Sequence, residues 1–182
     1  MDRRTSLAAF GTLAAHALFP RVLDTWAATL DAQAATGAWQ PRTLSPAAGA
    51  QVAALADAII PDTDTPGARA AGVHVFIDLL LADCMTVEDR TAFVDGLAAF
   101  DASCRQAHGA GIEGATPAQR TALLVRAEGE KNAFVQSLKS LTVLGYGSSK
   151  IGASQALAWV AVPGGYRGCI DLAPGQRTWV QR

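Results

Sequence analysis

Side chains that could do chemistry are few in this 182-residue chain and lie far apart. The three histidines, His16, His74 and His108, have no partner at the spacing that a metal site needs. The chain has no Glu-x-x-His pair, phosphate loop, Gly-x-Ser-x-Gly or Cys-x-x-Cys-His motif. No set of residues supplies a nucleophile, a base and a charge stabiliser together. The sequence therefore predicts a noncatalytic chain with no cofactor or metal of its own.

The pair Asp62 and Asp64 resembles the opening of a calcium-binding loop. Such a loop places a bidentate Glu at its twelfth position, where this chain has Val73. We therefore interpret both aspartates as residues that end a helix and form Asx-turns.

The three cysteines, Cys84, Cys104 and Cys169, are too dispersed for an iron–sulfur motif. Cys84 and Cys104 lie near the ends of two consecutive predicted helices, about 25 Å apart if these helices form an antiparallel hairpin. A disulfide needs Cα atoms within about 7 Å, so we do not expect these two to pair and interpret both as buried thiols. Cys169, in a glycine-rich tail, is the disulfide candidate. Its partner could be either of the others or a cysteine of a second protein.

Three aromatic side chains, Tyr146, Trp159 and Tyr166, lie close together in the sequence near the C-terminus. Aromatic side chains are enriched in protein interfaces, but they are equally common in cores. The sequence leaves both interpretations open.

Helix signals recur along the chain, and strand signals do not. Ser45-Pro46 and Thr116-Pro117 are caps followed by proline at the first helical position, and Thr86 with Asp89 forms a capping box. Apolar residues recur at spacings of three and four. The pattern predicts a compact, single-domain, all-α bundle of about six helices with a glycine-rich C-terminal loop. These helices begin at Pro46, near Gly72, after Thr86, at Pro117, near Asn132 and near Ser149, the last two ending near Leu144 and Trp159.

The composition disfavours some classes of partner. Fifteen Lys and Arg and sixteen Asp and Glu give a net charge of -1 with no basic run, so we do not expect a nucleic-acid partner. Charged residues are only 17% of the chain, against about 25% in an ordinary soluble domain. Mean hydropathy is +0.19, and no segment is long enough to explain it as a membrane helix. We therefore expect another protein to cover part of the apolar surface.

The N-terminal segment has the layout of an export signal. Arg3 and Arg4 precede an uncharged apolar stretch from Leu7 to Phe19, and small residues continue to Gly37. Paired arginines ahead of a weak apolar stretch indicate the twin-arginine route, which carries folded proteins. We therefore expect a periplasmic protein.

The alternative is an amphipathic first helix of a cytoplasmic domain, although Gly11, Thr12 and His16 would weaken it. An uncut apolar segment would at most tether the chain, because a membrane span needs about 20 apolar residues. We divide the chain into a twin-arginine-type export signal and spacer over residues 1–36 and a helical domain over residues 37–182.

Several stretches between Leu44 and Cys169 resemble one protein family. They are Leu44-Ser-Pro46, the run from Ala54 to Val73, Phe76-Ile77-Asp78, Leu141-Thr142, Gly145-Tyr146, Ile151-Gly152-Ala153, and Pro163-Gly-Gly-Tyr166 ahead of Gly168-Cys169. The resemblance is to subunit 3, the small subunit, of gluconate 2-dehydrogenase and related periplasmic dehydrogenases. The chain differs from the family pattern at Gly147, where an aromatic is more usual, and at Lys150, where an acid is.

The resemblance implies a role in a larger complex. Such chains accompany a large subunit of the glucose–methanol–choline (GMC) oxidoreductase type, which carries FAD and oxidises a sugar or sugar acid. A cytochrome c subunit, with haem c, commonly takes the electrons. The small subunit usually carries the export signal for the large one.

We therefore expect a noncatalytic small subunit that stabilises the flavin subunit and escorts it through twin-arginine export. Membrane association would then arise only through the complex or an uncleaved signal. The residues expected to act are Arg3 and Arg4 in targeting, and Tyr146, Trp159, Tyr166 and Cys169 in partner contacts. The alternatives are a periplasmic adaptor for another protein and a stand-alone enzyme with an unrecognised site.

Overall fold

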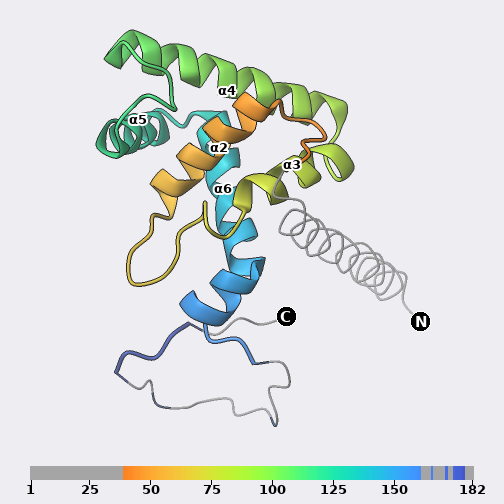
Figure 1. The fold of residues 1–182 in the computed structure, drawn as a ribbon, viewed down its shortest axis with the longest axis vertical. Helices are drawn as coiled ribbons and strands as arrows, with labels where there is room; N and C mark the ends of the chain where they lie inside the picture. Colours follow the sequence, from red (N-terminus) through yellow and green to blue (C-terminus); the bar gives the residue numbers. More distant parts are fainter. Residues whose placement is uncertain (1–38, 161–164, 166–170, 172–173, 179–182) are drawn as a thin grey trace, which may run out of the picture.

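Five α-helices and one π-helical turn form the computed structural model, which describes residues 39–160, 165, 171 and 174–178 (Figure 1). Within these residues there is no strand, so the predicted all-α fold is confirmed. The elements are α2 (Pro46–Ile59), α3 (Val73–Asp83), α4 (Val87–His108), α5 (Pro117–Gly129), α6 (Ala133–Ser148) and the π-helical turn η1 (Gly152–Ala156).

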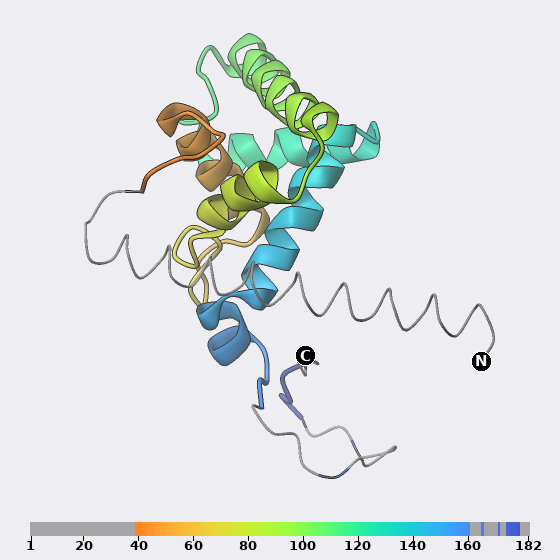
Figure 2. The same cartoon turned by 90° about the vertical axis from the view of Figure 1, so that its right-hand side faces the viewer.

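Helix α6 is the central element, since it contacts each of the other four α-helices. Helix α4 crosses one end of the molecule, and η1 continues from α6 at the other end (Figures 1 and 2). The main hydrophobic core takes side chains from all five α-helices, including Val52, Ile77, Phe93, Leu123 and Leu138, and Val75, Phe76 and Leu79 of α3 form a second, smaller cluster. None of the described helices is both long enough and apolar enough to cross a membrane.

Four of the five described α-helices begin where the sequence places side-chain caps; α3 begins after Gly72 without one. The side chains of Ser45, Thr86, Thr116 and Asn132 each accept a hydrogen bond from a backbone N–H three residues later. A reciprocal capping box forms at Thr116, where the Gln119 side chain accepts the Thr116 N–H. At Thr86 only half of the expected box is present, because the Asp89 carboxylate accepts the Thr86 hydroxyl instead of its backbone N–H.

Helix α6 runs to Ser148, four residues beyond its predicted end near Leu144. Two glycines bring its neighbours close. A Cβ on Gly145 would lie 2.6 Å from a ring carbon of Phe76 on α3, and a Cβ on Gly96 of α4 would lie 2.7 Å from the Cβ of Phe134. Because glycine has no side chain, the helices approach closely at these two positions, and an aromatic residue of the neighbouring helix fills the space.

The predicted sixth helix is shorter than expected. Its π-helical turn covers Gly152–Ala156, directly after the helical residues Lys150 and Ile151. Leu157 then turns to extended backbone with φ -108° and ψ 163°. The next residue, Ala158, donates its N–H to the Thr178 carbonyl at 2.8 Å. Pairing with the C-terminal segment thus ends the helix before Trp159.

A buried carboxylate anchors the N-terminal strap, residues 39–44, to α3. Asp78 is 1% exposed and accepts the backbone N–H groups of Arg42, Thr43 and Leu44 at 2.7, 2.9 and 2.7 Å. A buried charge is costly unless hydrogen bonds compensate it, and these three bonds do so. The anchor also fixes the chain immediately before Ser45, where α2 is capped.

A second buried acid closes the loop between α4 and α5. Asp101 is 7% exposed and accepts the Ile112 N–H at 2.8 Å as well as the Arg105 Nε–H at 2.8 Å. The carboxylate of Asp62, in the loop after α2, accepts the Gly67 N–H in a similar way. Asp62 therefore closes this loop across five residues, so the expected Asx-turn, which spans two, is not the bond that it makes. The Asp64 carboxylate accepts the Thr63 hydroxyl, and α2 already ends at Ile59.

We predict that Asp78→Ala lowers the free energy of unfolding by about 3 kcal/mol, because three N–H groups lose their acceptor. Asp83→Ala is the matched control on the same helix. It removes only the exposed ion pair with Arg42 and should cost less than about 1 kcal/mol. Urea unfolding of the full chain followed by circular dichroism measures both. Equal losses for the two variants would contradict the anchoring role of Asp78.

Candidate functional site

Tyr146, one of the residues expected to contact a partner, lies in the core. Its side chain is 8% exposed, and its hydroxyl donates a hydrogen bond to the Pro66 carbonyl at 2.7 Å. Gly152 lies against the Tyr146 carbonyl, where an added Cβ would come within 1.9 Å of the oxygen. Of the two roles left open by the sequence, the structure favours the core for Tyr146, which joins the end of α6 to the loop after α2.

Trp159, in contrast, is 48% exposed. The backbone on its N-terminal side is held in place by the C-terminal segment. The Arg177 guanidinium donates to the carbonyls of Ser154 at 3.3 Å and Gln155 at 2.7 Å, next to the bond between Ala158 and Thr178. The indole is thus presented outward from a tethered backbone, and a contact role for it stays a prediction.

Four of the residues expected to act fall outside the described residues. These are Arg3, Arg4, Tyr166 and Cys169. Targeting by the paired arginines, contacts of Tyr166 and bonding of Cys169 therefore stay predictions from the sequence.

Cys84 and Cys104 are both free thiols, so they are not bonded to each other, as expected. Cys104 is fully buried, but Cys84 is exposed at the end of α3, and its prediction as a buried thiol was wrong. Helix α3 ends at Asp83, which leaves Cys84 beyond the buried face. Desolvation raises the pKa of both thiols, and the adjacent carboxylates of Asp83 and Asp101 raise it further. Protonated thiols are poor nucleophiles and poor metal ligands.

His74 is the histidine whose surroundings perturb it most clearly. Its Nδ1 is buried without a hydrogen-bond partner, and its ring meets the Trp39 indole edge to face with centroids 5.3 Å apart. Burial lowers the pKa of His74, Arg69 lowers it further, and Asp78 partly opposes the shift. His74 belongs to the packing beneath the strap, and among the described residues no three His, Cys, Asp or Glu side chains gather as a metal site.

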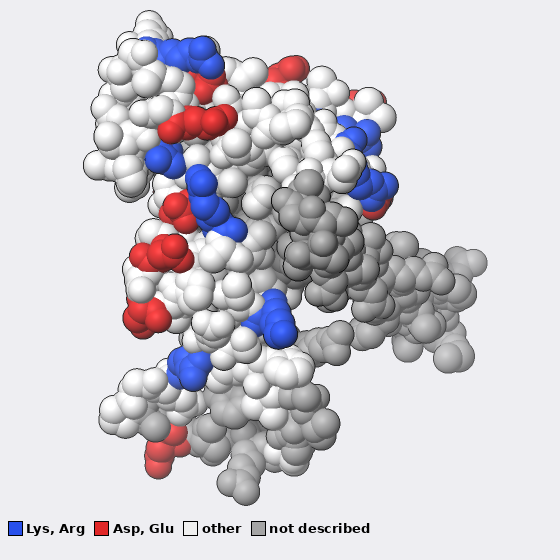
Figure 3. All heavy atoms as spheres, viewed as in Figure 1, with Lys and Arg blue, Asp and Glu red and all other residues white. Residues whose placement is uncertain are grey.

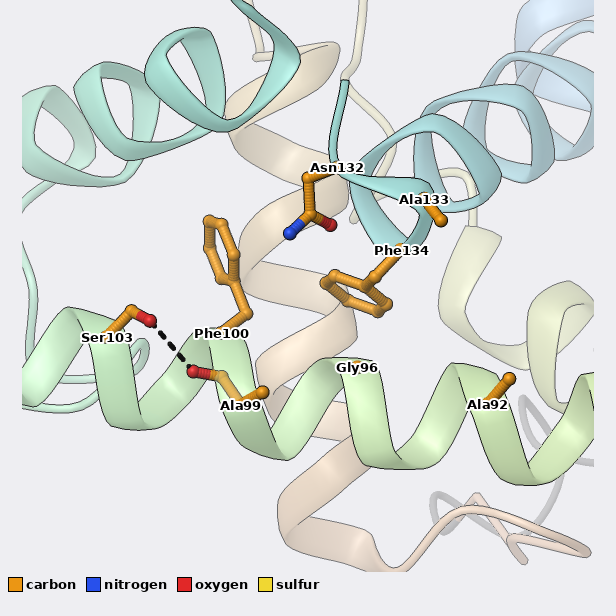
Figure 4. A pocket seen from close by; sticks show the side chains of 8 residues that line it. All are labelled: Ala92, Gly96, Ala99, Phe100, Ser103, Asn132, Ala133 and Phe134. Carbon is orange, nitrogen blue, oxygen red and sulfur yellow. Dashed lines mark hydrogen bonds between the residues drawn. The ribbon is translucent and has the colours of Figure 1, made fainter. Parts of the chain in front are cut away.

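A shallow groove of about 280 Å³ lies between α4 and the start of α6 (Figure 4). Small residues of α4 form one wall of the groove, which is also lined by the rings of Phe100 from α4 and Phe134 from α6. Ser103 and Asn132 supply the polar side chains of the groove. The Ser103 hydroxyl donates a hydrogen bond to the Ala99 carbonyl, and the Asn132 side chain caps α6. The lining contains no acid, base or thiol. On the face of the molecule seen in Figure 3, acidic and basic side chains are interspersed. Neither the groove lining nor this mixed distribution of charge identifies a reacting group.

The carboxylates of Asp78 and Asp101 and the Tyr146 hydroxyl therefore serve the fold. The family model described as gluconate 2-dehydrogenase subunit 3 matches residues 46–164, which include all the helices described above. The chain belongs to this family. No curated protein and no solved structure matches the chain. Family membership makes the chain an accessory-type subunit of a multisubunit dehydrogenase complex.

The anchoring role of Asp78 was not predicted from the sequence, although this residue lies in one of the stretches that resemble the family. Val143 and Leu144 of α6, which are 54% and 42% exposed, were not predicted either. A signal for these two exists. Both lie off the helix face that carries the buried residues Leu138, Leu141 and Gly145.

We predict that His74 makes the folded protein less stable as the pH falls. Its folded-state pKa lies below the ordinary value of 6.5, so below that pH the unfolded chain binds a proton that the folded chain does not. The His74 contribution to stability is therefore fully present above the unfolded-state pKa. It is lost as the pH falls from there through the lower folded-state pKa. His74→Phe keeps an aromatic ring against Trp39 and removes this titration.

The measurement is urea unfolding of both proteins at pH about 7 and about 5. Wild type should lose more stability than His74→Phe, by up to about 1.4 kcal/mol per pH unit. The same loss in both proteins would show that His74 does not contribute.

Proposed function

We propose that this chain is the noncatalytic small subunit of a periplasmic FAD-dependent dehydrogenase that oxidises a sugar or sugar acid. Its large partner is a flavin subunit of the GMC type, and a cytochrome c subunit with haem c accepts the electrons. The observation that carries the proposal is the family match over residues 46–164.

The chemistry of the described residues supports the noncatalytic assignment. The buried carboxylates of Asp78 and Asp101 accept backbone N–H groups, and the pKa values of both described thiols are raised. The α4–α6 groove has no side chain that could act as an acid or a base near neutral pH. Oxidation of a sugar needs a hydride acceptor and a base, which the proposal assigns to the flavin subunit.

Export belongs to the same proposal. Arg3 and Arg4 ahead of the apolar stretch from Leu7 to Phe19 have the layout of a twin-arginine signal. Because that route carries folded proteins, the small subunit binds the flavin subunit in the cytoplasm and crosses the membrane with it. The folded complex thus needs only one signal.

Purification of the tagged chain from the periplasm of its native host tests the complex. We expect a large protein to co-purify with the visible absorption bands of flavin, together with haem bands if the cytochrome subunit is retained. The amount of flavin per tagged chain gives the stoichiometry. A colourless, monodisperse small protein would contradict the proposed function and favour the adaptor alternative.

Replacement of the paired arginines tests the escort role. In the double variant Arg3→Lys and Arg4→Lys, we expect the flavin subunit to remain active but to stay in the cytoplasm. The measurement is dehydrogenase activity in cytoplasmic and periplasmic fractions. A single variant at Arg42, outside the signal, is the control and should leave the distribution unchanged. Activity that still reaches the periplasm in the double variant would refute the escort role.

A further inference from the structure

Exposed apolar side chains are concentrated at one end of the molecule. Of the seven large apolar side chains exposed in the described residues, Val87, Val94 and Val125 are scattered over α4 and α5. The other four are Val143 and Leu144 on α6, and Trp159 and Val160 beyond η1, with exposed fractions from 42% to 54%. Single exposed apolar residues are ordinary, but a group of them marks an interaction site.

Leu157 links the α6 pair to the pair beyond η1. Val143 and Leu144 lie one helical turn before Gly147 on α6. Gly147 has no side chain, and a Cβ there would meet only the Leu157 Cδ1, at 3.9 Å. Leu157 is half-buried and leads directly to Trp159 and Val160. We call Val143, Leu144, Leu157, Trp159 and Val160 the α6-end patch.

The core of this chain accounts for only part of the segment that completes the patch. Between Lys150 and Val160 only Gly152 is buried, while Ile151 and Ala156 are partly buried against the core. The hydrogen bonds of Arg177 and Thr178 nevertheless hold this backbone in place. The family match continues through the whole segment to residue 164. A segment that is held in position but contributes little to its own core is suited to contact another protein.

The charges beside the patch discriminate between occupants. Between Ser140 and Val160 the only charged side chain is Lys150, and Arg177 lies against η1. Lys139 is already paired with Glu128. A second copy docking on the same patch would bring these positive charges together across a two-fold axis. A partner with an apolar centre and an acidic rim fits better.

We propose that the α6-end patch is the surface on which the flavin-carrying large subunit docks. This inference rests on the proposed function, which supplies the partner. Trp159 and Val143 provide the apolar centre of the contact, because buried aromatic side chains dominate interface energies. Lys150 and Arg177 face acidic groups at the rim. Since a stable interface buries about 800 Å² on each side, the patch is the centre of a wider contact.

The test compares full-length tagged chains purified identically from the native host, with bound flavin per chain measured from visible absorbance. Val143→Asp places a charge in the patch. Val125→Asp is the matched control, because Val125 is 64% exposed on α5, which lies away from η1 (Figures 1 and 2). We expect Val143→Asp to lower bound flavin about tenfold or more and the control to leave it unchanged.

Folding is monitored by circular dichroism and thermal unfolding of each variant. Trp159→Ala provides a second test outside the α-helices, where no helix depends on the side chain. It should also reduce bound flavin while leaving the melting temperature unchanged. If folded Val143→Asp and Trp159→Ala both retain the wild-type amount of flavin, the patch is not the docking surface, and the proposed function still stands.

Two further outcomes distinguish a failure of the proposed function from a failure of the docking assignment alone. If the wild-type chain itself brings down no flavin subunit, the proposed function fails, and the docking assignment fails with it. If sedimentation shows a wild-type dimer that Val143→Asp dissociates without any change in bound flavin, the patch binds a second copy, and the docking assignment is overturned.

Discussion

The carboxylate of Asp78 sets the condition on which the rest of the fold depends. It is buried on α3, and its charge is compensated by three N–H groups of the strap that immediately precedes α2. The strap must therefore lie along α3 before α2 can begin at its Ser45 cap. Because an uncompensated buried charge costs several kcal/mol, other paths for the strap are disfavoured. One side chain thus holds the strap that leads into α2 against α3.

Helix α6 extends this arrangement to the whole bundle. It contacts α2, α3, α4 and α5, so the position of each depends on the shape of its surface. Gly145 lets Phe76 of α3 lie against the helix backbone, while Phe134 fills the space beside Gly96 of α4. Interiors are packed closely, and a large side chain therefore requires a small one opposite. Towards its C-terminal end the same helix turns Val143 and Leu144 outward, so one element organises the core and also carries exposed apolar surface.

Local signals in the sequence predicted the helices well because caps and apolar spacing act within a few residues. Ser45, Thr86 and Thr116 begin helices where expected, with prolines at two of the starts. Features that local signals could not predict arise where distant segments meet. The bonds of Asp78 span at least 34 residues, and the sixth helix is cut short by pairing with Thr178. Tyr146 is likewise buried through a bond to Pro66. The candidate contact surface was predicted only at Trp159, because the apolar spacing of α6 was used to locate its buried face and not the opposite face that carries Val143 and Leu144.

The strap also lies outside the region by which the family is recognised. The family match starts at residue 46, the first residue of α2. A polypeptide cut there would keep Asp78 buried but would lack all three of its backbone donors. A cut before Trp39 would retain them, together with the indole that packs over Gly49 and His74. A residue on α3 therefore depends on a segment of chain that lies upstream of the region by which the family is recognised.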